Sequence, residues 1–198
     1  MKSPMPWVCL VALSNVSLAF ADEGLDAYRE GHYLQAAQKL TAGNGKDPVV
    51  DYYMGRMRLY GYGQLKNNVL AMRHFKEAAE RGFLPAQRIM ARVALFVDNN
   101  PEQAAYWFKK SADANDLPAQ MYCAAAYLFG VGVKQNQDLA RRYYIAAAKN
   151  GDSIAQYTVA ESFLETKHAA NKTLGLIWLN KSVAQNNPEA QLMLGELY

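Results

Sequence analysis

Apolar residues recur along this chain at the spacing of one helix face. They follow an i, i+4, i+7 pattern in three successive segments: Val50, Met54 and Met57; Ala86, Met90 and Val93; Ala119, Cys123 and Ala126. Because a helix turns once in about 3.6 residues, this spacing places the side chains of each segment in one stripe. Each segment is therefore predicted to be an amphipathic helix that buries its stripe.

A second pattern alternates with the first. It reads small, bulky, bulky, small, small at positions i, i+3, i+4, i+7 and i+8, which again share one helix face. Its four copies are Ala71, His74, Phe75, Ala78 and Ala79; Ala104, Trp107, Phe108, Ser111 and Ala112; Ala140, Tyr143, Tyr144, Ala147 and Ala148; Gly175, Trp178, Leu179, Ser182 and Val183. We interpret the repeated aromatic stripe as core packing and not as a cofactor-binding box.

One position repeats at an almost constant interval. It is occupied by Val50, Ala86, Ala119, Ala155 and Ala190, which are 36, 33, 36 and 35 residues apart. Gln follows four of these residues, at 87, 120, 156 and 191, whereas Asp51 follows the first. This period is typical of an α-solenoid. We predict repeats at 48–84, 85–117, 118–152 and 153–187, with a partial unit at 188–198.

Small residues stand at a further repeated position. They are Gly55, Ala91, Ala124, Ala160 and Gly195. A small side chain allows a neighbouring helix to approach closely, so we expect these residues to set the packing distance. Pro48, Pro85, Pro118 and Pro188 stand at or just before the start of four of the predicted helices, where proline is tolerated.

The first 21 residues have the three parts of a cleavable secretory signal: Lys2, an apolar run from Trp7 to Leu18, and Ala19-Phe20-Ala21. We predict a cut between Ala21 and Asp22. The rest of the chain has no apolar stretch long enough to span a bilayer, so we expect a periplasmic or secreted protein. An acylated lipoprotein is the competing interpretation, but no small residue precedes Cys9.

Composition and charge exclude some classes of function. The chain is 51% hydrophobic and 20% charged, with a formal net charge of +3 and no long basic block. It therefore lacks the concentrated basic face expected of a nucleic-acid binder. Removal of the signal would leave Cys123 as the one cysteine, without an intramolecular disulfide partner, and its position in an apolar stripe predicts a small core residue.

The sequence offers weak candidates for chemistry. Gly61-Tyr62-Gly63 and Gly130-Val131-Gly132 each follow a helix and not a strand, so we interpret them as turn glycines and not as a phosphate cradle. His32, His74 and His168 lie in different units with no acidic or Cys partner at ligand spacing, so no metal site is predicted.

His74 occupies a core aromatic position, and a pH-sensitive packing site is the alternative interpretation of that residue. Glu161 and Glu165 are an i, i+4 pair that we interpret as a solvated helix face. Asn171-Lys172-Thr173 fits a glycosylation sequon, which would matter only in a eukaryotic secretory protein. The chain shows no recognisable catalytic set and no cofactor motif.

These features together resemble the Sel1-like repeat family, which is related to tetratricopeptide repeats. The resemblance covers 48–198 and is closest in 118–151, where an Ala-Gln helix is followed by Gly-x-Gly-Val and an aromatic helix. It is weaker around 97–101 and 165–170, where Gly-x-Gly is missing and differently shaped turns are expected. Residues 22–47 resemble a tetratricopeptide hairpin with two short helices around Gly31-His32.

The resemblance implies an all-α fold, a solenoid of antiparallel hairpins that forms a right-handed superhelix. One row of each first helix would then line the concave surface. These rows are Tyr52, Arg56, Tyr60; Arg88, Arg92, Phe96; Met121, Ala125, Phe129; Tyr157, Glu161, Glu165; Leu192, Glu196. The rows are rich in Arg and Tyr at one end and acidic at the other. From them we take Tyr52, Arg56, Arg88, Arg92, Tyr157 and Glu161 as partner-binding residues, because Arg and Tyr commonly anchor interfaces.

The first functional hypothesis is a non-enzymatic extracytoplasmic adaptor that holds a protein or peptide segment, with Tyr52, Arg56, Arg88 and Arg92 contacting an acidic part of it. Secreted bacterial members of the family include the enhanced-entry proteins of intracellular pathogens. The resemblance to them implies a role in host-cell interaction or in controlling a cell-wall enzyme.

Two other hypotheses stay open. One is weak hydrolysis or binding of a cell-wall or β-lactam-like ligand, as implied by cysteine-rich relatives, although their paired cysteines are absent here. The other is a purely structural segment of a longer scaffold. Leu192, Leu194 and Leu197 lie in a last unit without a second helix. This suggests a fragment of a longer repeat protein, the alternative being a final helix that caps the stack.

Overall fold

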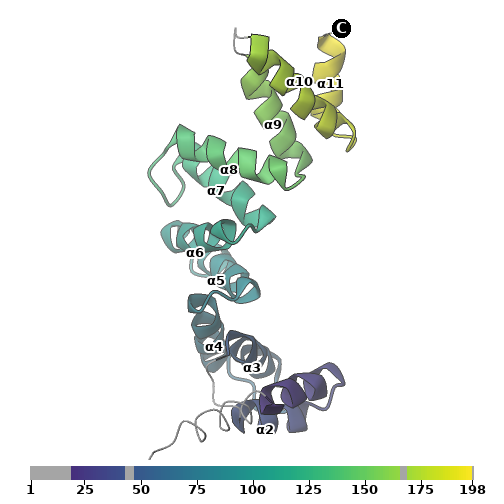
Figure 1. The fold of residues 1–198 in the computed structure, drawn as a ribbon. Coiled ribbons are helices and arrows are strands. Elements are labelled where there is room, and N and C mark those ends of the chain that lie inside the picture. Colours follow the sequence, from purple (N-terminus) through teal and green to yellow (C-terminus); the bar gives the residue numbers. More distant parts are fainter. Residues whose placement is uncertain (1–18, 43–46, 166–168, 198) are drawn as a thin grey trace, which may run out of the picture. The chain divides into compact units, whose positions relative to one another are not determined.

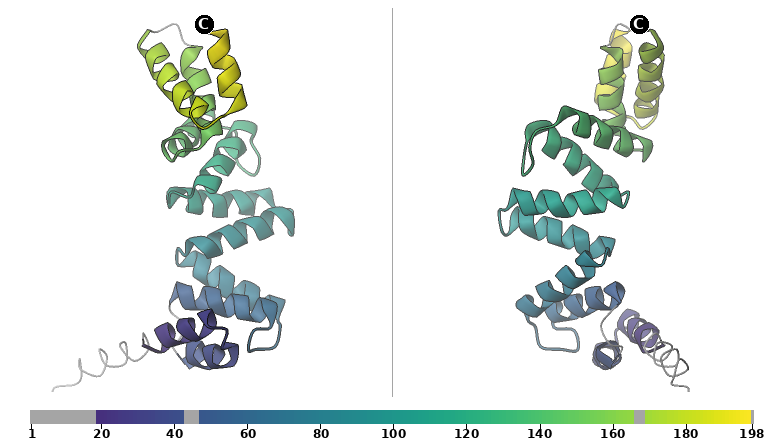
Figure 2. Two further views of the ribbon diagram at one scale, coloured as in Figure 1. Left: turned by 90° about the vertical axis from the view of Figure 1, so that its right-hand side faces the viewer. Right: turned by 60° about the vertical axis from the view of Figure 1, so that its left-hand side comes forward.

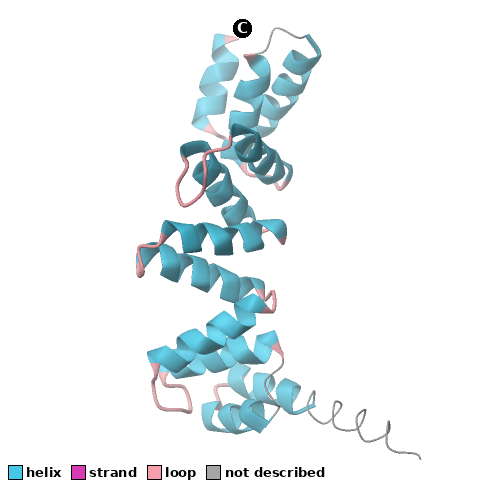
Figure 3. Cartoon of the chain, turned by 90° about the vertical axis from the view of Figure 1, so that its left-hand side faces the viewer, coloured by secondary structure: helices cyan, strands magenta, loops and turns pink. Residues whose placement is uncertain are grey.

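The computed structural model describes residues 19–42, 47–165 and 169–197, and within these ranges every regular element is an α-helix (Figure 3). A helix at 19–29 is followed by α2 (Tyr33–Ala42), α3 (Pro48–Tyr60), α4 (Asn68–Glu80), α5 (Leu84–Phe96), α6 (Pro101–Asp113), α7 (Leu117–Phe129), α8 (Gln137–Lys149), α9 (Ser153–Leu164), α10 (Ala169–Val183) and α11 (Pro188–Glu196). The expected all-α fold is confirmed.

The chain divides into two compact units, residues 1–90 and 91–198, and the boundary falls inside α5. Within each unit, helices that follow one another in the sequence pack side by side as antiparallel hairpins (Figures 1 and 2). In the first unit α3 packs against α4, and in the second α7 packs against α8 and α9 against α10. The expected right-handed superhelix stays a prediction, as do the repeat boundaries.

Side-chain caps begin most of the helices. An Asn or Asp just before the helix accepts a hydrogen bond from a backbone N–H of the first turn, at 2.7–3.0 Å, which satisfies a donor that the helix itself leaves unpaired. The capping residues are Asp47, Asn67, Asn100, Asn136, Asp152 and Asn187. Proline stands in the first turn of α3, α5, α6, α7 and α11, as expected at four of these positions.

The two Gly-x-Gly segments are turns, as predicted. Gly61 and Gly130 end α3 and α7 in the left-handed conformation, at φ 76° and 73°. The second glycine of each turn has an additional role. A Cβ on Gly132 would lie 2.1 Å from the carbonyl oxygen of Pro101, the first residue of α6, and Gly63 faces the carbonyl of Tyr33, the first residue of α2, in the same way. The turn therefore packs directly on the preceding second helix.

The turn after α5 is shaped differently, as expected from the missing Gly-x-Gly. There Asn99 adopts a positive φ of 48°, and Asn100 caps the following helix. Asn tolerates the left-handed region better than most residues that carry a side chain, which explains why glycine is dispensable here. Asn44-Gly45 and His168 lie outside the described residues.

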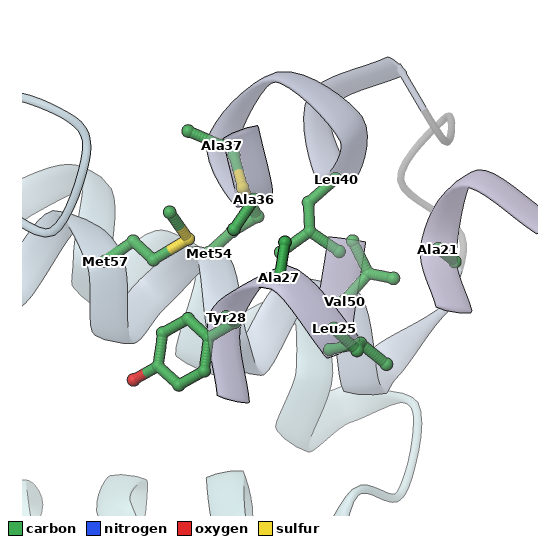
Figure 4. Close-up of a cluster of buried hydrophobic side chains, with 10 residues drawn as sticks. All are labelled: Ala21, Leu25, Ala27, Tyr28, Ala36, Ala37, Leu40, Val50, Met54 and Met57. Carbon is green, nitrogen blue, oxygen red and sulfur yellow. The ribbon is translucent and has the colours of Figure 1, made fainter. Parts of the chain in front are cut away.

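The core of the first unit joins the N-terminal hairpin to α3. Val50, Met54 and Met57 are 2%, 8% and 0% exposed, which confirms their predicted stripe. Figure 4 shows them in one cluster with side chains of the helix 19–29 and of α2, among them Leu25 and Leu40. Ala21, the last residue of the predicted signal, is also buried in this cluster. The cleavage itself stays a prediction.

The second unit is built from the repeated aromatic stripe. Trp107 and Leu179 are 2% and 0% exposed, and the alanines of the stripe are almost fully buried. Tyr143 stacks on Tyr127 with the ring centroids 5.8 Å apart, as a core aromatic would. The interpretation of this stripe as packing is confirmed.

The small residues set the helix spacing in some repeats but not in all. A Cβ on Gly55 would come within 2.8 Å of the Phe75 ring, and Ala91, Ala124 and Ala160 are fully buried. The prediction is wrong for Gly195, which is exposed and has open space around it, since no described helix packs on that side of α11. On the same helix Leu192 is 66% exposed.

Substitution of the second turn glycine tests the loop contact. We expect Gly132→Ala to lower the free energy of unfolding by more than Gly151→Ala. Both residues have a positive φ, which costs a side-chain-bearing residue about 1–2 kcal/mol, but Gly151 has open space where Gly132 meets a carbonyl oxygen. Urea unfolding followed by circular dichroism measures the difference. Equal losses of unfolding free energy in the two variants would show that the close contact between the Gly132 turn and Pro101 does not matter for stability.

Candidate functional site

The six residues predicted to bind a partner lie on three first helices. Tyr52 and Arg56 are on α3, Arg88 and Arg92 on α5, and Tyr157 and Glu161 on α9. Both arginines of α5 are exposed, and the other four side chains are partly buried. The structure brings Tyr52 together with Arg56, and Tyr157 together with Glu161. That all six form one binding surface stays a prediction.

Arg56 sits among tyrosine rings. Its guanidinium carbon lies 5.6 Å from the centre of the Tyr28 ring and 6.0 Å from those of Tyr52 and Tyr53. Tyr53 is in edge contact with both of the other rings. A guanidinium at this distance is attracted to the negative charge on the ring face. Burial raises the pKa of Tyr28, and the positive charge of Arg56 partly offsets that rise.

Sequence reasoning missed Tyr28 and Tyr53. Tyr53 stands outside the row that contains Tyr52, and Tyr28 lies in the N-terminal hairpin, to which the repeat register does not extend. Neither residue therefore gave a signal of its own. The structure shows that the N-terminal hairpin contributes one of the rings around Arg56, that of Tyr28.

Tyr157 and Glu161 are bonded to each other. The Tyr157 hydroxyl donates to the Glu161 carboxylate over 3.1 Å. Burial, this hydrogen bond and the negative charges of Glu189 and Glu196 raise the pKa of Tyr157. The acidic end of the predicted rows is therefore found on α9 and α11, within the second unit. Arg88, by contrast, already interacts with other groups of the chain.

Large apolar residues at the end of three first helices stay exposed. They are Tyr60, Phe96 and Phe129, with 56%, 73% and 72% of their surface exposed. They occupy the same position in three consecutive repeats, the last residue of their rows. Their helices bury other faces, so these side chains have no role in the core. The rows contained all three, but none was among the selected site residues, and the preference for Arg and Tyr explains the omission of Phe96 and Phe129 only.

Asp51 forms a buried tie between α3 and α4. It is 3% exposed, and its carboxylate contacts the Arg81 guanidinium and lies 3.2 Å from Nδ1 of His74. The expectation that His74 has no acidic partner is wrong, because helix packing brings Asp51 to it from another helix. The interpretation of His74 as a side chain packed in the first repeat agrees with this contact.

Later repeats make the same tie with neutral amides. Gln156 accepts a hydrogen bond of 2.8 Å from Gln185, and Gln120 accepts one of 2.9 Å from Asn150. These pairs are separated by 29 and 30 residues, and Asp51 and Arg81 by 30. The first repeat therefore uses an ion pair where the third and fourth use an amide pair.

Asp51, His74 and Glu77 have the composition of a metal site. Their ligand atoms all lie within 4.8 Å of one another. However, Arg81 contacts Asp51, and Nε of Arg73 lies 3.8 Å from the Glu77 carboxylate. Both carboxylates thus already face a guanidinium, which opposes the binding of a cation. We interpret the group as the tie between α3 and α4.

The second unit gathers several groups with possible acid–base or nucleophilic roles around Cys123. This thiol is 2% exposed, and burial, together with the charge of Asp113, raises its pKa to about 12. The nearby Tyr143 also has a raised pKa, chiefly because of burial. A hydrogen bond to Asp113 raises the pKa of Lys109. None of the three is shifted toward the reactive, deprotonated form. Cys123 is a core residue, as predicted.

Comparison with known proteins agrees with this architecture. The Sel1 repeat family matches residues 50–83, 92–116 and 117–152. The chain belongs to the Sel1 repeat family. An uncharacterized protein of Neisseria meningitidis serogroup B is 31% identical over 101 residues, which are 51% of this chain and 21% of the relative. The chain thus spans about a fifth of that relative.

Two solved Sel1-type structures are similar to this Sel1 repeat chain. One is a protective antigen present in uropathogenic Escherichia coli strains, with 27% identity, a TM-score of 0.72, and coverage of 94% of this chain and 42% of the antigen. The other is a Sel1 repeat protein from Oxalobacter formigenes, with 26% identity, a TM-score of 0.69, and coverage of 89% and 74%. Among the described residues, no helix is long and apolar enough to cross a membrane.

The Asp51 tie can be tested by converting it to the form used in later repeats. We expect Asp51→Ala to lower the free energy of unfolding by about 1–3 kcal/mol, since it removes the buried carboxylate that contacts Arg81 and His74. The double variant Asp51→Gln with Arg81→Gln should regain much of this loss by reproducing the Gln156–Gln185 pair. Urea unfolding measures both. A double variant no more stable than Asp51→Ala would contradict the equivalence of the two ties.

The Cys123 thiol should resist modification in the native chain. Because its pKa is raised to about 12, the thiolate is scarcely populated at pH 8. In a Cys9→Ser variant, whose one thiol is Cys123, we therefore expect a thiol-specific reagent to react only as fast as the chain unfolds, and rapidly in urea. The measurement is the rate of absorbance change with a chromogenic disulfide. Rapid reaction of the folded chain would show that the thiol is accessible.

Proposed function

We propose that this Sel1 repeat chain is a non-enzymatic adaptor that binds a protein or peptide segment along the exposed rows of its first helices. The supporting observation is the exposure of Tyr60, Phe96 and Phe129 at one position in three consecutive repeats. Exposed apolar surface, where it is contiguous, commonly marks a protein–protein interaction site. Aromatic side chains are also enriched where proteins bind each other.

The construction of the helices supports this role for the rows. α3 buries Val50, Met54 and Met57, and α7 buries Ala119, Cys123 and Ala126. These faces are used by the fold, whereas Tyr60, Phe96 and Phe129 at the row ends stay exposed for another molecule. Repeat arrays characteristically present such an extended surface.

The polar residues of the rows would contact two kinds of group on the partner, one acidic and one basic. Tyr52, Arg56, Arg88 and Arg92 would face an acidic part of the bound segment. Tyr157 and Glu161 would face a basic part, since Glu189 and Glu196 add negative charge nearby.

The protein is proposed to act outside the cytosol, in the periplasm or after secretion. The signal-like segment at 1–21 supports this location, and the similar Escherichia coli protein is a protective antigen. Host-cell interaction and the control of a cell-wall enzyme are the two roles that the family resemblance implies. The repeat surface fits either role.

The hydrolase alternative has less support than the adaptor. Two of its candidate nucleophiles, the Cys123 thiol and the Tyr143 hydroxyl, have pKa values that burial raises, which disfavours their deprotonated forms. Turnover of nitrocefin by the purified chain would favour this alternative. A chain that captures nothing specific would favour the purely structural role.

The adaptor function is tested by the double variant Phe96→Ser with Phe129→Ser. We expect the wild-type chain to capture specific proteins from an extracytoplasmic extract, and the double variant to capture them at least about tenfold less, because two exposed apolar anchors are lost. Quantitative mass spectrometry of the captured proteins is the measurement.

Ile177→Ser provides a matched control. Ile177 is 48% exposed in the same unit, but it lies on the second helix α10, outside the rows. It should leave capture unchanged. Unaltered capture by a correctly folded double variant would contradict the assignment of the binding surface to the first-helix rows.

A further inference from the structure

We infer that Arg56 and the surrounding rings of Tyr28, Tyr52 and Tyr53 form a binding site for a single carboxylate of the partner segment. The inference rests on the proposed function. It specifies which chemical group of the partner one site in the first unit binds. The four residues are called the Arg56 site below.

The first argument is an uncompensated charge. Arg56 is partly buried, and among the described residues its guanidinium makes no hydrogen bond and no ion pair. Its contacts are with aromatic rings, which attract the cation but accept none of its five N–H donors in the way an oxygen does. Partial burial of a cation is unfavourable unless an anion is nearby. The site is therefore suited to an anion from another molecule.

The second argument is preorganisation. Three rings from two parts of the first unit surround the guanidinium, because Tyr28 belongs to the N-terminal hairpin whereas Tyr52 and Tyr53 belong to α3. Tyr28 is itself held in the buried cluster drawn in Figure 4. A guanidinium that is already confined loses little conformational freedom when it binds. The site thus avoids part of the usual entropy cost of using a long side chain.

The third argument concerns the kind of anion. Arg56 is the one cation that acts on the Tyr28 hydroxyl among the described residues. One positive charge matches a carboxylate, whereas a phosphate group carries nearly two negative charges and usually meets several cations. The planar guanidinium can hold both carboxylate oxygens at once, and the rings offer an apolar wall to the body of the ligand.

Arg92 shows that the site belongs to the first repeat. It occupies the same row position as Arg56, one repeat later, but it is exposed and no tyrosine ring lies over it in the described part of the chain. An arginine at this position of a row is therefore not sufficient to form such a site. The N-terminal hairpin and the Tyr52-Tyr53 pair distinguish the first repeat.

The test uses the full chain and small probes, independently of any captured partner. N-acetylphenylalanine carries one carboxylate on an apolar body, and its amide has the same body without the charge. N-acetylaspartylphenylalaninamide carries the charge on a side chain, so the two acids show whether the site accepts the carboxylate of a chain terminus, of an acidic side chain, or of both. Phenyl phosphate is the fourth probe. Binding is followed by the NMR signal of the Arg56 side-chain N–H groups.

We expect both acids to shift this signal and the neutral amide to leave it unchanged. Arg56→Gln should weaken binding by about tenfold or more, measured by calorimetry, since a charge-assisted double hydrogen bond is lost. Arg56→Lys should weaken it less, because the charge stays but the planar fork is lost. Arg73→Gln, an exposed change in the same unit, should leave it unchanged.

Three results would overturn the inference: no shift with either acid, an equal shift with the neutral amide, or tighter binding of phenyl phosphate than of both acids. These results can be told apart from failure of the adaptor function. Loss of partner capture in the Phe96→Ser, Phe129→Ser variant tests the adaptor and does not depend on the Arg56 site.

Discussion

The structure depends on the close approach of neighbouring helices through small side chains. Ala71, Ala86, Ala104, Ala119, Ala147, Ala155 and Ala190 are each completely buried. At Gly55 even a single methyl group would collide with the Phe75 ring. With so little side-chain volume between backbones, helices pack tightly only in a fixed register. The remaining space is filled by the aromatic stripes of the second helices.

This packing also determines which side chains are left for function. A helix that uses one stripe to meet its own hairpin and another to meet the next can leave only a narrow row exposed. The exposed aromatic residues of three repeats lie in that row, beyond the buried turns. Function in such a protein comes from the side chains that packing does not use, so differences between repeats carry more functional information than their shared features.

The first repeat departs most from the others in its polar chemistry. It replaces a neutral amide tie by Asp51 and Arg81, and it surrounds Arg56 with tyrosines from two helices. Both features place charged groups in partly or fully buried positions. Asp51 contacts the Arg81 guanidinium and the His74 ring, whereas Arg56, within the described residues, contacts aromatic rings alone. This contrast separates a structural charge from one that is available to a ligand.

The sequence by itself determined the fold class, the helical stripes, the turn glycines and the core position of Cys123, because these follow from periodicity and local backbone preference. The tertiary structure decided the contacts between segments distant in the sequence. It brought Asp51 to His74, placed Gly132 against Pro101, and added Tyr28 and Tyr53 to Arg56. It also showed that Gly195 sets no packing distance. A repeat register identifies equivalent positions but not the neighbours of each, since those depend on how adjacent hairpins dock.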